Sequence, residues 1–218
     1  QGVEFAGYHG KSAPEIKKML DDNGIVCCGT HTGWDTLSDA NLAATIEFNK
    51  TLGNKYLIVP GLPGECTSSR QAWLNTAARF NVLAERVKPH GMRVGYHNHT
   101  IEFKPLEGEM PWDTFMKNTG KDVVMQLDTG NALAGNANIM QTLNDYPGRC
   151  QTIHLKPYSR AKGYEPLIGE DDCPWKDIFA FCQTKGNTEW YIIEYECPAY
   201  PALEAVEKCL VATRKLLE

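Results

Sequence analysis

The chain has 218 residues, of which 42% are hydrophobic and 22% are charged, a composition typical of a globular protein that can bury a core. Its formal net charge of −5 argues against a nucleic-acid or anionic-membrane partner, because either needs a basic surface. No apolar stretch approaches the roughly 18 residues that a membrane helix requires.

The cysteines have neither a C-x-x-C pair nor a zinc-finger spacing, although the chain contains 8 of them. Several lie in apolar runs such as GIVCCGT and IFAFC, so we interpret them as reduced thiols in the core of a cytoplasmic protein. The chain begins with Gln1 in place of Met, which leaves open a processed or truncated form, including one that has lost a signal peptide.

Short β-branched or aromatic runs alternate with amphipathic stretches along the whole chain. In chain order, the pattern predicts strand Val3–Phe5, helix Ala13–Asp22, strand Ile25–Gly29, helix Ser38–Leu52, strand Tyr56–Val59, helix Ser69–Lys88, strand Arg93–His97, a helix near Trp112–Asn118, strand Val123–Asp128, a helix near Asn138–Asp145, strand Thr152–Lys156, a helix near Trp175–Lys185, strand Tyr191–Glu196 and a helix near Pro201–Leu217. Gly24 and Gly91 suit helix C-caps, and Ser12 and Ser38 suit helix starts.

Strict β-α alternation predicts a parallel sheet in an α/β protein. An open nucleotide-binding sheet would carry a Gly-rich loop after its first strand, and FAGYHGKS does not match it. We therefore expect a (β/α)8 TIM barrel that forms one domain over residues 1–218. Only seven strands are predicted where a barrel needs eight, so we expect this chain to lack the first β-α unit.

Ionisable residues follow strand after strand, at the ends where barrel enzymes place their active sites. They are His31, His97, His99, Asp128, His154, Lys156, Glu194 and Glu196. Each residue alone has an ordinary structural explanation. Asp128 could be the N-cap of a helix, and Glu194 could form an ion pair with Lys156 that only stabilises the fold. Their coincidence at successive strand ends predicts a site, and a mixed set of imidazole and carboxylate groups suits Mn²⁺, Zn²⁺, Fe²⁺ or Co²⁺ better than Ca²⁺.

At these residues the chain resembles the sugar phosphate isomerase/epimerase family, the xylose isomerase-like barrels. The matching segments are GYHNHTIEF, QLDTGNALAG, IHLKPY, IGEDDCPW and YIIEYE, which run in the family's order. GVEFAGY resembles the family's second strand, in agreement with a missing first unit.

The resemblance implies one divalent metal ion held by four side chains. Asp128, His154 and Glu194 match three of the family's ligands, but His97 stands where the family has a Glu. The fourth ligand is therefore His97, His99, Glu102 or water. Manganese is our first expectation, with zinc, iron, cobalt and magnesium left open.

The resemblance also implies substrate contacts. Asn131 stands where relatives often have a His, Lys156 resembles a substrate-contacting or proton-shuttling position, and Glu170 lies on the rim. We expect His31, Asn131, Glu102 and Glu170 to contact substrate, and Glu194, Lys156 and His99 to be catalytic.

The function implied is a metal-dependent sugar isomerase or epimerase that acts on a sugar or keto-sugar through an enediolate. Glu194 or Lys156 would remove the proton next to the carbonyl, and His31, His97 or His99 would handle another proton. Because His97 replaces a carboxylate, a lyase or dehydratase acting on a keto-sugar or keto-inositol stays open. So do a keto-glycoside lyase, a non-catalytic sugar-binding barrel and an endonuclease-IV-like phosphodiesterase. Barrels of this class often dimerise, so a homodimer also stays open.

Overall fold

Two groups of residues form separate compact units in the computed structural model, which describes residues 1–218. The first unit comprises Gln1–His97 and Asp113–Val124, and the second comprises Asn98–Trp112 and Met125–Glu218. Helix α4 (Pro111–Lys117) and strand β5 (Val124–Gln126) cross the division. The prediction of one domain stays a prediction.

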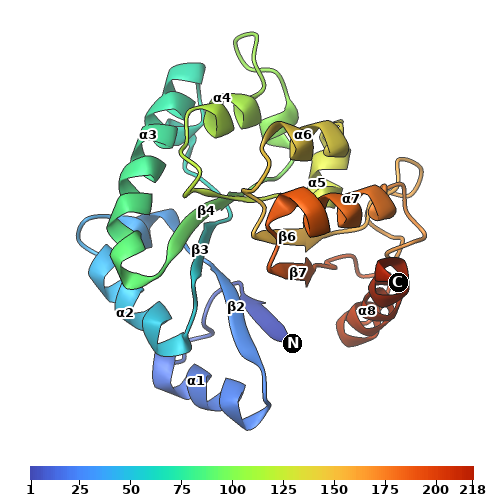
Figure 1. The fold of residues 1–218 in the computed structure, drawn as a ribbon, viewed down its shortest axis with the longest axis horizontal. Coiled ribbons are helices and arrows are strands. Elements are labelled where there is room, and N and C mark those ends of the chain that lie inside the picture. Colours follow the sequence, from blue (N-terminus) through green and yellow to red (C-terminus); the bar gives the residue numbers. More distant parts are fainter. The chain divides into compact units, whose positions relative to one another are not determined.

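The first unit repeats a strand followed by a helix (Figure 1). Its strands are β1 (Gly2–Phe5), β2 (Val26–His31), β3 (Tyr56–Val59) and β4 (Arg93–His97), and its long helices are α1 (Ala13–Asp22), α2 (Leu42–Leu52) and α3 (Arg70–Val87). Each strand pairs in parallel with the next one in the chain, and β5 follows β4 in the strand order. Short 3-10 turns cover Trp34–Leu37 (η1), Gly64–Cys66 (η2) and Lys88–His90 (η3).

The predicted helix ends of this unit are largely confirmed. Gly24 and Gly91 have φ of +63° and +71°, the left-handed backbone that favours glycine after a helix. At the start of α1, the Glu15 carboxylate accepts hydrogen bonds from the backbone and hydroxyl of Ser12. The prediction that Ser38 starts a helix is wrong. Ser38 directly follows η1, a turn comes next, and α2 begins only after its N-cap residue, Asn41.

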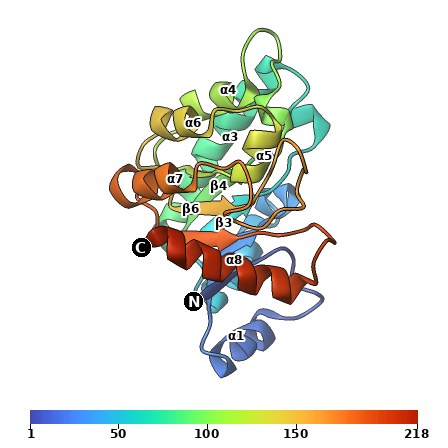
Figure 2. The same ribbon diagram turned by 90° about the vertical axis from the view of Figure 1, so that its right-hand side faces the viewer.

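The second unit contains β6 (Thr152–Leu155) and β7 (Trp190–Ile193), which pair in parallel. Its helices are α5 (Thr129–Ala134), α6 (Ile139–Asp145), α7 (Trp175–Phe181) and α8 (Ala202–Leu217); η4 (Ile101–Phe103) is a 3-10 turn, and a π-helical turn, η5 (Cys182–Gly186), extends α7. Helix α8 packs against β7 and α7 (Figure 2).

Strands β3 and β6 are buried along their whole length, as expected for central parallel strands covered on both faces. Trp73, Phe80, Tyr96 and Phe115 form an aromatic cluster in the first unit, with ring centroids 4.8–6.0 Å apart. Seven strands form, the number that the sequence predicts. All eight cysteines are free thiols, and no helix combines the length and apolarity needed to cross a bilayer.

Candidate metal centre

Asp128 lies at the junction of β5 and α5, where it is fully buried. It is the N-cap of α5, because its Oδ1 accepts a hydrogen bond from the backbone N of Asn131 at 2.7 Å. Its own backbone N donates to Asn98 Oδ1 at 2.8 Å, and Asn98 Nδ2 donates back to the Asp128 carbonyl at 3.2 Å. These contacts fix the position of the carboxylate.

The parallel register brings His154 and Glu194 to the same strand ends as Asp128. Asp128 forms a parallel bridge with His154, whose backbone N donates to Leu127 O at 2.9 Å. The backbone N of Glu194 donates to Leu155 O at 3.3 Å. As a result, one possible ligand atom from each of Asp128, His154 and Glu194 lies within 4.8 Å of the other two. His154 Nδ1 is also in hydrogen-bond contact with Glu194 Oε2.

The two carboxylates of this group lie in buried surroundings that disfavour two negative charges. Burial, followed by the charge of Glu194, raises the pKa of Asp128 to about 8, against smaller opposing effects of Lys156 and His154. Two carboxylates and an imidazole held this close are a fitting donor set for a divalent transition metal, since such a cation would offset the repulsion. The group is therefore a possible metal-binding site.

Lys156 is the cation of this group, with its side chain only 8% exposed. Its Nζ donates to Glu194 Oε1 at 3.1 Å and to Glu196 Oε2 at 2.5 Å. Burial lowers the pKa of Lys156. The negative charges of Asp128, Glu194 and Glu196 together raise it by more, so the pKa lies above its ordinary value. The ammonium form is therefore favoured.

Gly130 and Thr129 connect the start of α5 to Lys156. A Cβ on Gly130 would lie 2.7 Å from the backbone O of Lys156, so only glycine allows this approach. The Thr129 hydroxyl lies within hydrogen-bond distance of the Lys156 backbone N and O, at 3.0 and 2.9 Å. The DTGN segment thus joins the two strand ends that carry Asp128 and Lys156.

Asn131 and Tyr164 form a second polar contact next to Lys156. The Tyr164 hydroxyl donates to Asn131 Oδ1 at 2.9 Å, and the ring centroid of Tyr164 lies 5.4 Å from Lys156 Nζ. Sequence reasoning missed Tyr164, because it belongs to the long loop between β6 and α7, where no strand-end pattern could point to it.

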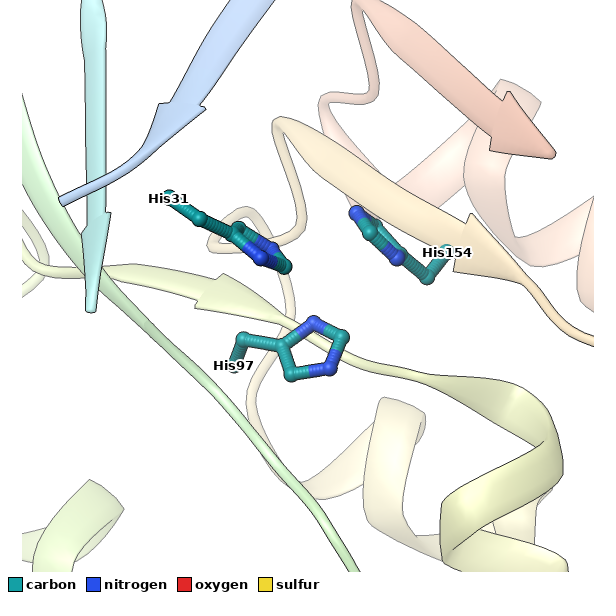
Figure 3. Close-up of side chains that lie close together, drawn as sticks. All are labelled: His31, His97 and His154. Carbon is teal, nitrogen blue, oxygen red and sulfur yellow. The ribbon is translucent and has the colours of Figure 1, made fainter. Parts of the chain in front are cut away.

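His31 and His97 end β2 and β4 of the first unit. Their ring centroids lie 4.9 Å apart, edge to face, and Figure 3 shows both rings. His31 Nε2 lies 3.2 Å from the Oε2 of Glu4, a residue that sequence reasoning also missed. His31 lines a pocket of about 550 Å³, together with Tyr8, Thr36, Asn41, Thr45, Phe48 and other residues of the first unit.

The remaining predicted site residues lie elsewhere in the second unit. Strand β4 ends at His97, so His99 does not continue its face and is exposed. Glu102 is buried in η4, where its Oε2 accepts a hydrogen bond from the His99 backbone N at 2.9 Å. Glu170 follows Gly169 in an exposed turn and lines a groove beside α8 with Lys208.

The alternation of parallel strands with helices, and the candidate metal ligands at the strand ends, define a protein of the β/α-barrel class. A family model described as a xylose isomerase-like TIM barrel matches residues 1–215. The chain therefore belongs to the xylose isomerase-like TIM barrel family, and the predicted fold class and resemblance are confirmed. A comparison with curated proteins gave no match.

Solved structures share the fold at low sequence identity. A sugar phosphate isomerase/epimerase from Parabacteroides distasonis ATCC 8503 has a TM-score of 0.81 and 24% identity, over 100% of this chain and 85% of that one. The IOLI protein with a binding zinc atom has a TM-score of 0.74 and 14% identity, over 99% and 87% of the two chains. AsbF, a probable 3-DHS dehydratase from Bacillus anthracis, has a TM-score of 0.69 and 13% identity, over 98% and 88%.

Proposed function

We propose that the chain is a divalent-metal-dependent isomerase or epimerase that acts on a sugar or keto-sugar. The observation that carries this proposal is the group formed by Asp128, His154 and Glu194, with the Lys156 ammonium 3.1 Å from Glu194. The family, and the isomerase/epimerase among the solved structures with this fold, support the same reaction class.

We propose His97 as the fourth ligand. It stands at the end of β4, and Asn98, the next residue, exchanges two hydrogen bonds with the backbone of Asp128. Glu102 stays the alternative; it is buried in η4, and its Oε2 accepts a hydrogen bond from the His99 backbone N at 2.9 Å. Manganese is our first choice. Zinc, iron, cobalt and magnesium stay open, and the zinc in the IOLI structure supports a transition metal.

When bound, a divalent cation at this centre would supply Lewis acidity to a substrate carbonyl. We assign the base to Glu194, whose side chain is 20% exposed and thus reachable by substrate. Its carboxylate takes the proton from the carbon next to the carbonyl, and the electrons of the broken C–H bond form an enediolate. Lys156 donates a hydrogen bond to the negative oxygen that develops.

The fate of the proton decides the product. Delivery of a proton to the former carbonyl carbon, with transfer of the α-hydroxyl proton to the former carbonyl oxygen, gives an isomer. Delivery of a proton to the original carbon on its opposite face gives an epimer. His31, His97 and His99 stay the candidates that the sequence gives for the second proton transfer. Asn131 and Tyr164 lie beside Lys156 and are placed to contact substrate hydroxyls.

The first test is the metal content of the purified protein, measured by elemental analysis. We expect about one divalent ion per chain, lost in Asp128→Ala but kept in Asp145→Ala, a control at the exposed end of α6. The metal-loaded protein should then convert a member of a keto-sugar panel, with both Asp128→Ala and Glu194→Ala inactive. If Asp128→Ala and Glu194→Ala both keep the metal and both still turn over substrate, the proposal is overturned.

Elimination is the second candidate, since the dehydratase AsbF shares this fold. In that reaction the same proton abstraction is followed by loss of a β-hydroxyl as water, which leaves a conjugated enone. Turnover in D₂O separates the two: isomerisation and epimerisation give a product of unchanged mass apart from exchanged deuterium, and elimination gives one lighter by water. A metal-loaded protein that binds sugars without turnover would favour the binding-protein alternative.

A further inference from the structure

A pocket of the first unit is formed by α2 and by the segments that follow β1 and β2. Its volume is about 550 Å³, within the range of small-molecule binding sites. All of its lining residues lie in Gln1–His97, and Asp128, His154 and Glu194 are not among them. The chemistry of the lining therefore indicates which ligand the first unit alone can hold.

Tyr8 and Phe48 form an aromatic wall of this pocket. Both residues are half-buried, and their ring centroids lie 4.2 Å apart with an interplanar angle of 32°. The Tyr8 hydroxyl accepts a hydrogen bond from Asn49 Nδ2 at 3.4 Å, and Asn49 Oδ1 accepts one from the Thr30 hydroxyl at 3.1 Å. Asn49 and Thr30 are fully buried, so this network holds the Tyr8 ring in place. A ligand that packs on the ring does not have to order it first.

The threonine hydroxyl protons of α2 and η1 are already used inside the protein. Thr36 Oγ1 donates to Gly33 O, and Thr45 Oγ1 donates to Thr36 O, both at 2.7 Å. Asn41 Nδ2 donates to Asp35 O at 3.0 Å. Because a hydroxyl has one proton and two lone pairs, the oxygens of Thr36 and Thr45 are left as acceptors, as is Asn41 Oδ1. The pocket therefore suits a ligand that donates hydrogen bonds.

The lining of the pocket includes no Asp, Glu, Lys or Arg side chain. Burial raises the pKa of Tyr8, so its phenol is neutral. A phosphate, carboxylate or ammonium group in this pocket would lose hydration without gaining an opposite charge from any of these four residue types. A neutral ligand with several hydroxyl groups avoids this cost.

We propose that this pocket of the first unit is a binding site for a neutral, unphosphorylated sugar ring. A C–H face of the ring packs on Tyr8 and Phe48, and its hydroxyls donate to the oxygens of Thr36, Thr45 and Asn41. The binding site does not rest on the proposed function, because the second unit contributes no residue to it. A sugar ring therefore binds here with or without a metal ion.

The experiment is a saturation-transfer NMR titration of the protein with the methyl glycosides of glucose, galactose and mannose. We expect at least one glycoside to bind saturably, with the same dissociation constant in the presence of a chelator and of Zn²⁺. The 6-phosphate of the glycoside that binds best should bind about tenfold more weakly or worse, because its charge has no counter-charge in the lining.

Substitutions on α2 locate the binding site. Ala44 is exposed and lines the pocket, so Ala44→Phe fills the space without disturbing the core and should raise the dissociation constant about tenfold or more. Phe48→Leu keeps an apolar side chain but removes the ring, and should raise the constant roughly fivefold. Ala43→Phe is the matched control, because Ala43 is the neighbouring exposed residue of α2 and does not line the pocket. It should change the constant by less than about twofold.

Four results would overturn the sugar site: no glycoside binds, binding requires the metal, the 6-phosphate binds equally well, or Ala44→Phe and Ala43→Phe bind alike. Each of them leaves the metal-content and turnover tests of the isomerase proposal untouched. Conversely, a protein that holds no metal but binds a glycoside in this pocket would contradict the isomerase proposal and support the sugar site.

Discussion

Asp128 is both the N-cap of α5 and a candidate metal ligand. Its Oδ1 caps α5 through the Asn131 backbone, and its carboxylate also belongs to the group of candidate metal ligands. A helix N-cap requires only an acceptor oxygen, whereas a metal ligand benefits from the full negative charge. In the metal-free protein, a charged carboxylate at this buried position therefore costs more free energy of folding than a neutral capping oxygen would.

This difference can be measured with Asp128→Asn, which keeps the capping oxygen and removes the charge. We expect the free energy of unfolding of the metal-free protein to rise by about 1–3 kcal/mol. The substitution removes a buried negative charge and its repulsion with Glu194. The metal should be lost from the same variant. Urea denaturation in the presence of a chelator measures the first effect, with Asp145→Asn as the exposed control. A less stable variant would show that the charge stabilises the metal-free fold.

The sequence could predict those site residues that stand at the ends of parallel strands, because the position along the strand determines where the side chain lies. Asp128, His154 and Glu194 follow apolar strands, so the strand rule brings them together. Glu4 and Tyr164 could not be found in this way. Glu4 reaches His31 only because the neighbouring strand carries Gly29, and Tyr164 depends on the course of a long loop.

At the level of the elements, the helix that matters most to the site is α5, of which the sequence indicated only the N-cap, Asp128. Helix α5 has only six residues and directly follows β5, so its amphipathic period is too short to recognise. Conversely, β2 extends to His31, two residues beyond the predicted end at Gly29. Both differences lie at strand ends, where polar residues replace the apolar pattern that predicts a strand.

The close contact between α5 and β6 gives a second prediction. Gly130→Ala would bring a methyl group to 2.7 Å from the Lys156 backbone O, and backbone cannot move as easily as the end of a side chain. We expect a loss of about 1–3 kcal/mol in the free energy of unfolding and a metal affinity reduced roughly 10- to 100-fold. Chemical denaturation and metal titration measure the two effects.

Gly61→Ala is the control for this substitution, because no atom lies within 4 Å of the Cβ that it would add. It should change stability by less than about 0.5 kcal/mol and leave metal binding intact. Equal behaviour of the two alanine variants would mean that the α5–β6 contact has no influence on the site.

For the whole molecule, the candidate ligands couple metal binding to folding. The His154 backbone N donates to Leu127 O, and the Glu194 backbone N donates to Leu155 O, and both hydrogen bonds exist only when the strands are in register. The unfolded chain has no such arrangement of Asp128, His154 and Glu194, so a metal ion held by these side chains would bind the folded protein preferentially. Any ligand with this preference raises the stability of the entire cooperative structure.

Thermal unfolding at increasing metal concentration tests this coupling. At 100 times the dissociation constant, the free energy of unfolding should rise by about 2.7 kcal/mol, which for a chain of this size raises Tm by about 5–10 °C. Mn²⁺ or Zn²⁺ should give the full shift and Ca²⁺ a much smaller one, because an imidazole ligand suits the transition metals. Asp128→Ala should abolish the shift. An equal response to Ca²⁺, or a shift that persists in Asp128→Ala, would place the metal on other groups of the protein.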